Sequence, residues 1–174
     1  FNPLSMLVLL AGLCALAYAK YPFDYSPMTA GLPAGEAEKT AAFMQTMMVN
    51  YSLGLMVQLP VIALLSWWIM GRHRGYGEHL AINAFIFAFM CVINLACMPI
   101  HMLANGGAWM PLALLASGTL FVVYQVYALW DTFRTPGRWF GPLLRAGLTS
   151  SGYLLIPVVI GVVAGALMAM RAGG

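Results

Sequence analysis

The sequence predicts an all-α integral membrane protein, a bundle of five transmembrane helices that forms a single domain over residues 1–174. Of its 174 residues, 62% are hydrophobic and only 7% are charged, and this composition supplies too little polar surface for a water-soluble domain of that length. Five long apolar runs follow one another through short connections. Each run reaches or nearly reaches the roughly 20 residues that cross a bilayer as a helix.

The first two spans are expected at residues 3–19 and 42–70. The uncharged start Phe1-Asn2-Pro3 is too short for a signal-peptide n-region, so the first run is interpreted as a true span, with sequence upstream of Phe1 missing. The second run would measure roughly 42 Å as one helix, longer than the hydrocarbon layer of about 30 Å. We therefore expect its N-terminal part to leave the bilayer, or the helix to tilt.

The remaining spans are expected at residues 78–103, 108–130 and 148–170. The fifth contains Gly161-x-x-x-Gly165, a spacing that lets two membrane helices approach closely. Five arginines fall in the connections that follow spans two and four: Arg72, Arg74, Arg134, Arg138 and Arg145. The positive-inside rule then places the N-terminus in the cytoplasm and the C-terminus outside.

Span three carries the polar pattern of the chain. At about 100° per residue its polar side chains fall within roughly 60° of one another, on one stripe of the helix; they are His79, Asn83, Asn94, Cys97 and His101. One interpretation is a packing seam in which these groups form hydrogen bonds to neighbouring helices. The alternative is a polar path for a proton, an ion or a small solute, to which Gln58 of span two would contribute.

The same residues argue against metal, cofactor or catalytic chemistry. His79 and His101 lie roughly 33 Å apart along a helix, so they cannot share an ion. No paired carboxylates and no Ser/His/Asp arrangement are evident within the spans, and no catalytic, cofactor or metal site is predicted. Glu78 is expected to cap the start of span three near Arg72 or Arg74, with His79 turned into the bundle beside Asn83.

Three short segments resemble a bacterial membrane family of unknown function, DUF3667. They are Phe1-Asn2-Pro3-Leu4-Ser5, then Gln58-Leu59-Pro60 followed by Ala63-Leu64-Leu65-Ser66, and then Gly75-Tyr76-Gly77-Glu78-His79-Leu80 with Asn83-Ala84-Phe85. They occur in the family's order over roughly the first 60% of the chain. The resemblance implies an all-helical membrane protein with no established activity. Family members usually carry a cytoplasmic N-terminal region, often with a zinc-ribbon-like cysteine motif. This chain lacks it, so the resemblance implies no metal site here.

The sequence therefore predicts a non-catalytic accessory or scaffolding subunit of a larger membrane complex. A small transporter or channel that uses the stripe of span three is the alternative. A membrane enzyme, with Glu78 and His79 as an acid–base pair, comes third. The expected partners are the lipid bilayer and other integral membrane subunits and not nucleic acid, and the expected location is the bacterial inner membrane.

Overall fold

The structure is a computed structural model and describes residues 2–71, 73–134, 137 and 139–155. The described part of the chain is helical throughout and contains no strand. Its helices are α1 (Pro3–Lys20), α2 (Ser26–Thr29), α3 (Ala34–Val49), α4 (Tyr51–Met70), α5 (Tyr76–Ala104) and α6 (Met110–Phe133). A further helical segment, here called the 140–155 helix, covers the last described residues.

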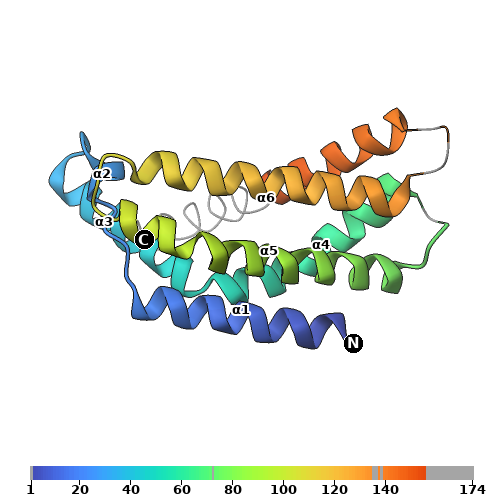
Figure 1. Cartoon of the computed structure of the whole chain (residues 1–174), viewed down its shortest axis with the longest axis horizontal. Helices are drawn as coiled ribbons and strands as arrows, with labels where there is room; N and C mark the ends of the chain where they lie inside the picture. Colours follow the sequence, from blue (N-terminus) through green and yellow to red (C-terminus); the bar gives the residue numbers. More distant parts are fainter. Residues whose placement is uncertain (1, 72, 135–136, 138, 156–174) are drawn as a thin grey trace, which may run out of the picture.

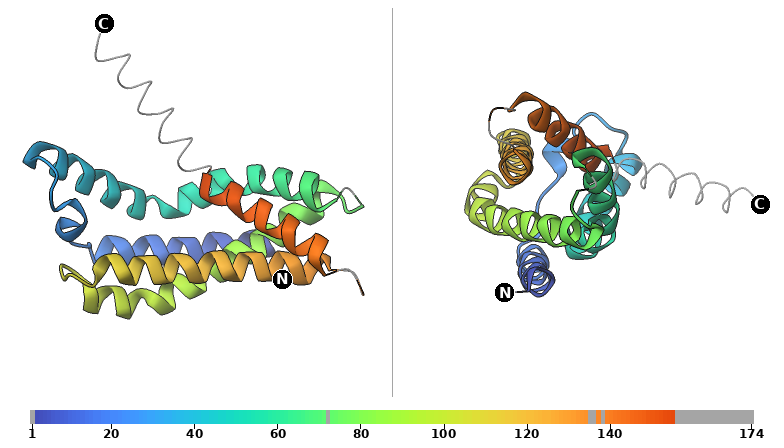
Figure 2. Two further views of the ribbon diagram at one scale, coloured as in Figure 1. Left: turned by 90° about the horizontal axis from the view of Figure 1, so that it is seen from above. Right: turned by 90° about the vertical axis from the view of Figure 1, so that its right-hand side faces the viewer.

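The long helices run side by side as an elongated bundle (Figure 1). α1 and α5 run in one direction, and α4 and α6 return in the other. Seen along its axis, α4, α5, α6 and the 140–155 helix surround a common interior, and α1 packs on the outer side of α5 (Figure 2). The start of α1 and the connections after α4 and α6 lie at one end of the bundle, here called the arginine end, and α2 with the α5–α6 turn lies at the other.

Within the described residues, three helices are long and apolar enough to cross a membrane: α1, α5 and α6. α4 contributes a shorter apolar stretch, Gly54–Met70. The outer faces of these helices carry large aliphatic side chains that are mostly exposed, among them Leu9, Leu16, Val57, Leu115 and Val123. Such a continuous apolar exterior is costly in water and is expected of helices that face lipid.

The expectation of one continuous helix over residues 42–70 is wrong, because the structure divides this run at Asn50. α3 ends at Val49 and α4 begins at Tyr51, and the backbone of Asn50 leaves the helical region with ψ at 15°. The side-chain amide of Asn50 donates a hydrogen bond to the carbonyl of Thr46 at 2.8 Å. The backbone N–H of Asn50 donates to the same carbonyl at 3.0 Å, so side chain and backbone share one acceptor, an arrangement that often bends a helix.

The expected start of the last helix also needs correction. The sequence placed the start at residue 148, after Arg145, whereas the helix begins at residue 140 and Arg145 lies exposed on its surface. A single arginine near a helix end is tolerated because its long stem lets the guanidinium reach the polar layer. Most of the predicted fifth span, including Gly161 and Gly165, lies outside the described residues.

The best-packed interface joins α1 to α5. Leu7, Ala11, Cys14 and Tyr18 repeat every three or four residues on α1, and all four are buried. The thiol of Cys14 donates to the carbonyl of Cys91 on α5 at 3.5 Å. Small buried residues on both helices, Ala11 on α1 and the Ala84/Ala88 pair on α5, let the two backbones approach closely.

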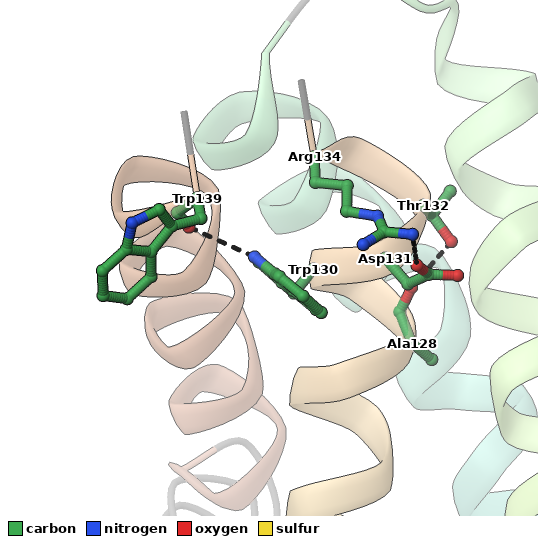
Figure 3. A network of polar contacts seen from close by, with 6 residues as sticks. All are labelled: Ala128, Trp130, Asp131, Thr132, Arg134 and Trp139. Carbon is green, nitrogen blue, oxygen red and sulfur yellow. Dashed lines mark hydrogen bonds and ion pairs between the residues drawn. The ribbon is translucent and has the colours of Figure 1, made fainter. Parts of the chain in front are cut away.

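At the arginine end, α6 stops at an ordered set of polar contacts (Figure 3). Asp131 and Arg134 form an ion pair of 3.0 Å. The indole of Trp130 donates to the carbonyl of Trp139 at 3.1 Å, which ties the end of α6 to the start of the next helix. Arg74 reaches over from the α4–α5 connection, with its guanidinium carbon 5.2 Å from the centre of the Phe133 ring. A cation at this point also complements the negative end of the α6 dipole.

Candidate functional site

The polar stripe of α5 faces the interior of the protein. His79, Asn83, Asn94 and His101 are all buried, with exposed fractions of 4% or less. Cys97 is half-buried. α5 contacts α1, α4 and α6, so its stripe meets different neighbours at different heights along the helix.

The first level is centred on His79. Its Nδ1 and the hydroxyl of Ser66 on α4 share a hydrogen bond of 2.8 Å, and its ring stacks on Phe133 of α6 with 4.9 Å between ring centres. One turn further along, the amide of Asn83 donates to the carbonyl of His79 at 2.8 Å. His79 thereby joins three helices at one point.

Glu78 belongs to a different environment from its neighbour. It is exposed, and its carboxylate accepts a hydrogen bond of 2.9 Å from the backbone N–H of Gly75, which caps the first turn of α5. Arg74, one of the two expected partners, is directed to Phe133 and the Thr132 carbonyl; the other, Arg72, lies outside the described residues. Glu78 and His79 therefore have different partners in the structure.

The middle of the stripe binds α1. The phenol of Tyr18 donates to Oδ1 of Asn94 at 2.7 Å, and both side chains are buried. A short O–H···O bond in an apolar surrounding satisfies two groups that would each be costly to leave unpaired. This contact anchors the packed face of α1 at one level of α5.

The far end of the stripe binds α6 and the α1–α2 connection. Nε2 of His101 lies 3.1 Å from the hydroxyl of Ser117 on α6. The ring of Phe23 approaches the same imidazole edge-on, with 5.9 Å between ring centres. His101 thus holds the segment between α1 and α2 against the α5–α6 pair.

Several buried polar atoms along this interior have no hydrogen-bond partner in the described part of the chain. They are Oε1 of Gln58, Nε2 of His79, Oδ1 of Asn83, Nδ1 of His101, both amide atoms of Gln125 and the hydroxyl of Ser150. An unpaired polar atom in a low-dielectric interior carries a desolvation cost, and such groups in native proteins commonly bind internal water. The stripe is therefore only partly satisfied by its helix partners.

Sequence reasoning did not identify the partners of the stripe: Tyr18, Ser66 and Ser117, or the fully buried Gln125. A signal was present, because Ser117 and Gln125 are polar residues within a predicted span, where each such group calls for an explanation. The pairing itself depends on the vertical register of neighbouring helices, which one sequence does not specify.

Two further observations bear on function. Among the described residues, no group of three or more His, Cys, Asp or Glu side chains is placed to hold a metal ion. Comparison with known protein families, with curated proteins and with solved structures finds no match to this chain.

Proposed function

We propose that this chain is a non-catalytic accessory or scaffolding subunit of a larger membrane assembly. The proposal is based on the contacts that the polar side chains of α5 form. Three of them contact another helix: His79 contacts α4 and α6, Asn94 contacts α1, and His101 contacts α6. Asn83 donates to the His79 carbonyl within α5 itself. Polar groups that hold helices together serve the architecture of a bundle.

The proposal includes five spans, with α4 and the helix that begins at residue 140 as the second and fifth. The N-terminus would lie in the cytoplasm and the C-terminus outside. The end of the bundle that holds the start of α1 also holds the connections after α4 and α6 (Figure 1). These connections contain Arg74 and Arg134, and clustered basic residues favour the cytoplasmic side. Membership of the DUF3667 family and a place in a bacterial inner membrane belong to the same proposal.

The lateral surface supports the assembly role. Large side chains stand exposed along α6 and the 140–155 helix, including Tyr127, Phe140 and Leu144. An apolar face suits lipid and an intramembrane partner equally, so a partner can bind in the bilayer without any specialised loop.

The test is the native size of the protein after mild detergent extraction from its own membrane. Blue-native electrophoresis, followed by identification of the subunits in the excised band, should show this 18.8 kDa chain in a larger complex with the same partners at fixed stoichiometry. Migration as a lone small protein in every mild detergent would contradict the proposal.

A second function, a path for a proton or small solute, is favoured by the unpaired atoms. Gln58, Asn83 and Gln125 offer buried polar groups from three helices, and water bound to such groups can conduct protons. Purified protein in liposomes loaded with a pH-sensitive dye would reveal this activity as a proton flux above that of empty liposomes. Absence of flux under an imposed pH gradient and membrane potential would exclude the proton form of this function.

A further inference from the structure

A small cavity of about 140 Å³ lies at the arginine end of the bundle. Three segments meet there: the end of α4 with the connection that follows it, the end of α6, and the first turns of the 140–155 helix. The cavity is smaller than the roughly 300–1,000 Å³ of sites for drug-sized ligands and larger than one water molecule needs, so it suits a small polar group. The described residues that line it are Met70, Gly71, His73, Phe133, Pro142 and Arg145.

The polar lining of this cavity is basic. His73 and Arg145 contribute to it, and no Asp or Glu is among the described residues that line it. An arginine is charged at every physiological pH. The guanidinium of Arg145 has no hydrogen-bond, ion-pair or ring partner within the part of the chain that the structure describes. The cavity therefore contains a positive charge that the described protein does not compensate.

His73 is held at the cavity by two close neighbours. Gly71 has φ of +123°, and a Cβ added to it would lie 2.9 Å from Nδ1 of His73. Glycine adopts this conformation without steric cost and leaves room for the ring. The same ring meets Phe133 edge-on, with 6.3 Å between ring centres. The backbone turn after α4 and the last residue of α6 together position the imidazole.

The carboxylates at this end of the bundle are engaged elsewhere. Asp131 is paired with Arg134 at 3.0 Å (Figure 3), and Glu78 caps the start of α5. Neither of them lines the cavity. Arg74 adds a further positive charge beside it, because its guanidinium carbon lies 5.2 Å from the centre of the Phe133 ring. The local potential is therefore positive and favours an anion.

The helix that carries Arg145 also presents an apolar surface. Phe140, Leu144 and Leu148 follow one another at intervals of four residues, and all three are exposed. Trp139 directly precedes this helix and is 63% exposed. Tryptophan is enriched at the level of the lipid head groups. A basic cavity at that level, beside an exposed apolar helix face, matches the two parts of a phospholipid.

We propose that this cavity binds the phosphate of an anionic phospholipid. The phosphate would lie against Arg145 and His73, and the acyl chains would pack along Leu144 and Leu148. Basic pockets between helices on the cytoplasmic side of a membrane bind anionic head groups in this way. The inference rests on the membrane-spanning arrangement proposed above and does not depend on the identity of any protein partner.

The experiment uses the full chain, purified and delipidated in mild detergent, with native mass spectrometry to measure lipid binding. The probes are dioleoyl phosphatidylglycerol and dioleoyl phosphatidylcholine, which have the same acyl chains and differ in net charge. Phosphatidylglycerol should bind at least about fivefold more tightly, which is the contribution expected of one arginine at a membrane surface. Equal binding of the two lipids would overturn the proposal.

Three variants locate the binding site. Arg145→Gln should weaken phosphatidylglycerol binding about fivefold and leave phosphatidylcholine binding unchanged. Arg134→Gln removes the same charge at the same end from a residue that does not line the cavity, and it should have no effect. His73→Gln should weaken phosphatidylglycerol binding about threefold, and this variant decides the matter if Arg145→Gln does not fold. Equal effects of Arg145→Gln and Arg134→Gln would indicate only a response to general positive charge and would contradict the site.

Inorganic phosphate and glycerol 3-phosphate distinguish a lipid head group from a soluble anion. Neither should displace phosphatidylglycerol even in large excess, because neither has acyl chains to pack on the helix. Displacement by either compound at concentrations comparable to that of the lipid would assign the cavity to a soluble phosphate and overturn the lipid assignment.

Incorporation of the chain into nanodiscs of phosphatidylcholine alone tests the membrane arrangement separately, because it requires no anionic head group. A chain that incorporates there and shows no preference for phosphatidylglycerol would refute the lipid site and leave the membrane arrangement standing. A chain that fails to incorporate would refute the arrangement and the lipid site together.

Discussion

The contact between Tyr18 and Asn94 provides the most direct energetic test of the α5 stripe. Tyr18→Phe removes only the hydroxyl that donates to Oδ1 of Asn94 at 2.7 Å, and the ring keeps its place in the α1–α5 interface. Hydrogen bonds between membrane helices contribute about 0.6 kcal/mol on average and up to about 1.7 kcal/mol. The bond is short and both groups are buried, and the substitution leaves the amide oxygen unpaired, so we expect a loss of about 1–2 kcal/mol.

A double-mutant cycle separates this bond from other effects of the two changes. The free energies of unfolding of wild type, Tyr18→Phe, Asn94→Ala and the double variant are measured in mixed micelles by denaturing-detergent titration. The coupling energy should be about 1 kcal/mol. Tyr127→Phe is the matched control, because this tyrosine of α6 is largely exposed, and it should change stability by less than about 0.5 kcal/mol. A coupling energy near zero would refute the view that the stripe binds α1.

Two further substitutions test the packing around α5. Gly106→Ala should destabilise the protein by about 1–2 kcal/mol, because Gly106 has φ of +72° and an added Cβ would lie 3.0 Å from the carboxylate of Asp24; Gly118→Ala, with open space around it, should be neutral or stabilising in the same thermal unfolding assay. Ala11→Leu should lower the free energy of unfolding by about 1–3 kcal/mol, because Ala11 is fully buried on the packed face of α1 and a larger side chain would overpack it. Ala116→Leu, on the exposed side of α6, should leave the free energy of unfolding unchanged. Equal unfolding midpoints for the two leucine variants would contradict the packing described for α1.

The helices that the sequence predicted well are those whose ends have local chemical signals. α1 starts where Asn2 caps the backbone N–H of Leu4 and Pro3 takes the first helical position. α5 starts where Glu78 caps Gly75. Both apolar runs are long, so composition alone predicts that a helix is present and capping chemistry predicts its first residue within about two positions.

The failures have a common physical origin. The run from residue 42 to 70 is apolar enough to suggest one span, and the break coincides with a single polar residue, Asn50, whose side chain binds the carbonyl of Thr46. The mean hydropathy of a long run does not reveal the effect of one such residue. The start of the last helix was placed too late because Arg145 was interpreted as part of a connection, although a charge near a helix end is compatible with helical structure.

Helical periodicity predicted that the polar residues of α5 share one inward face, because residues at spacings of three, four and seven lie on the same side of a helix. Periodicity did not predict their hydrogen-bond partners. Whether Asn94 meets Tyr18 or His101 meets Ser117 depends on how far each helix slides along its neighbour, and a change of one turn would give each residue a different partner. Periodicity predicts the face, and only the three-dimensional structure provides the register.

The most direct test of the central claim, that the α5 stripe holds the protein together, is the abundance of stripe variants in the native membrane. His79→Leu, Asn94→Leu and His101→Leu are compared by quantitative immunoblot with Thr119→Leu, an exposed polar residue of α6 that binds only its own helix. Our account predicts that the three stripe variants fall below about half of the wild-type level, with Thr119→Leu unchanged. Stripe variants that remain fully abundant and keep their place in the native complex, but lose a solute or proton flux, would contradict it.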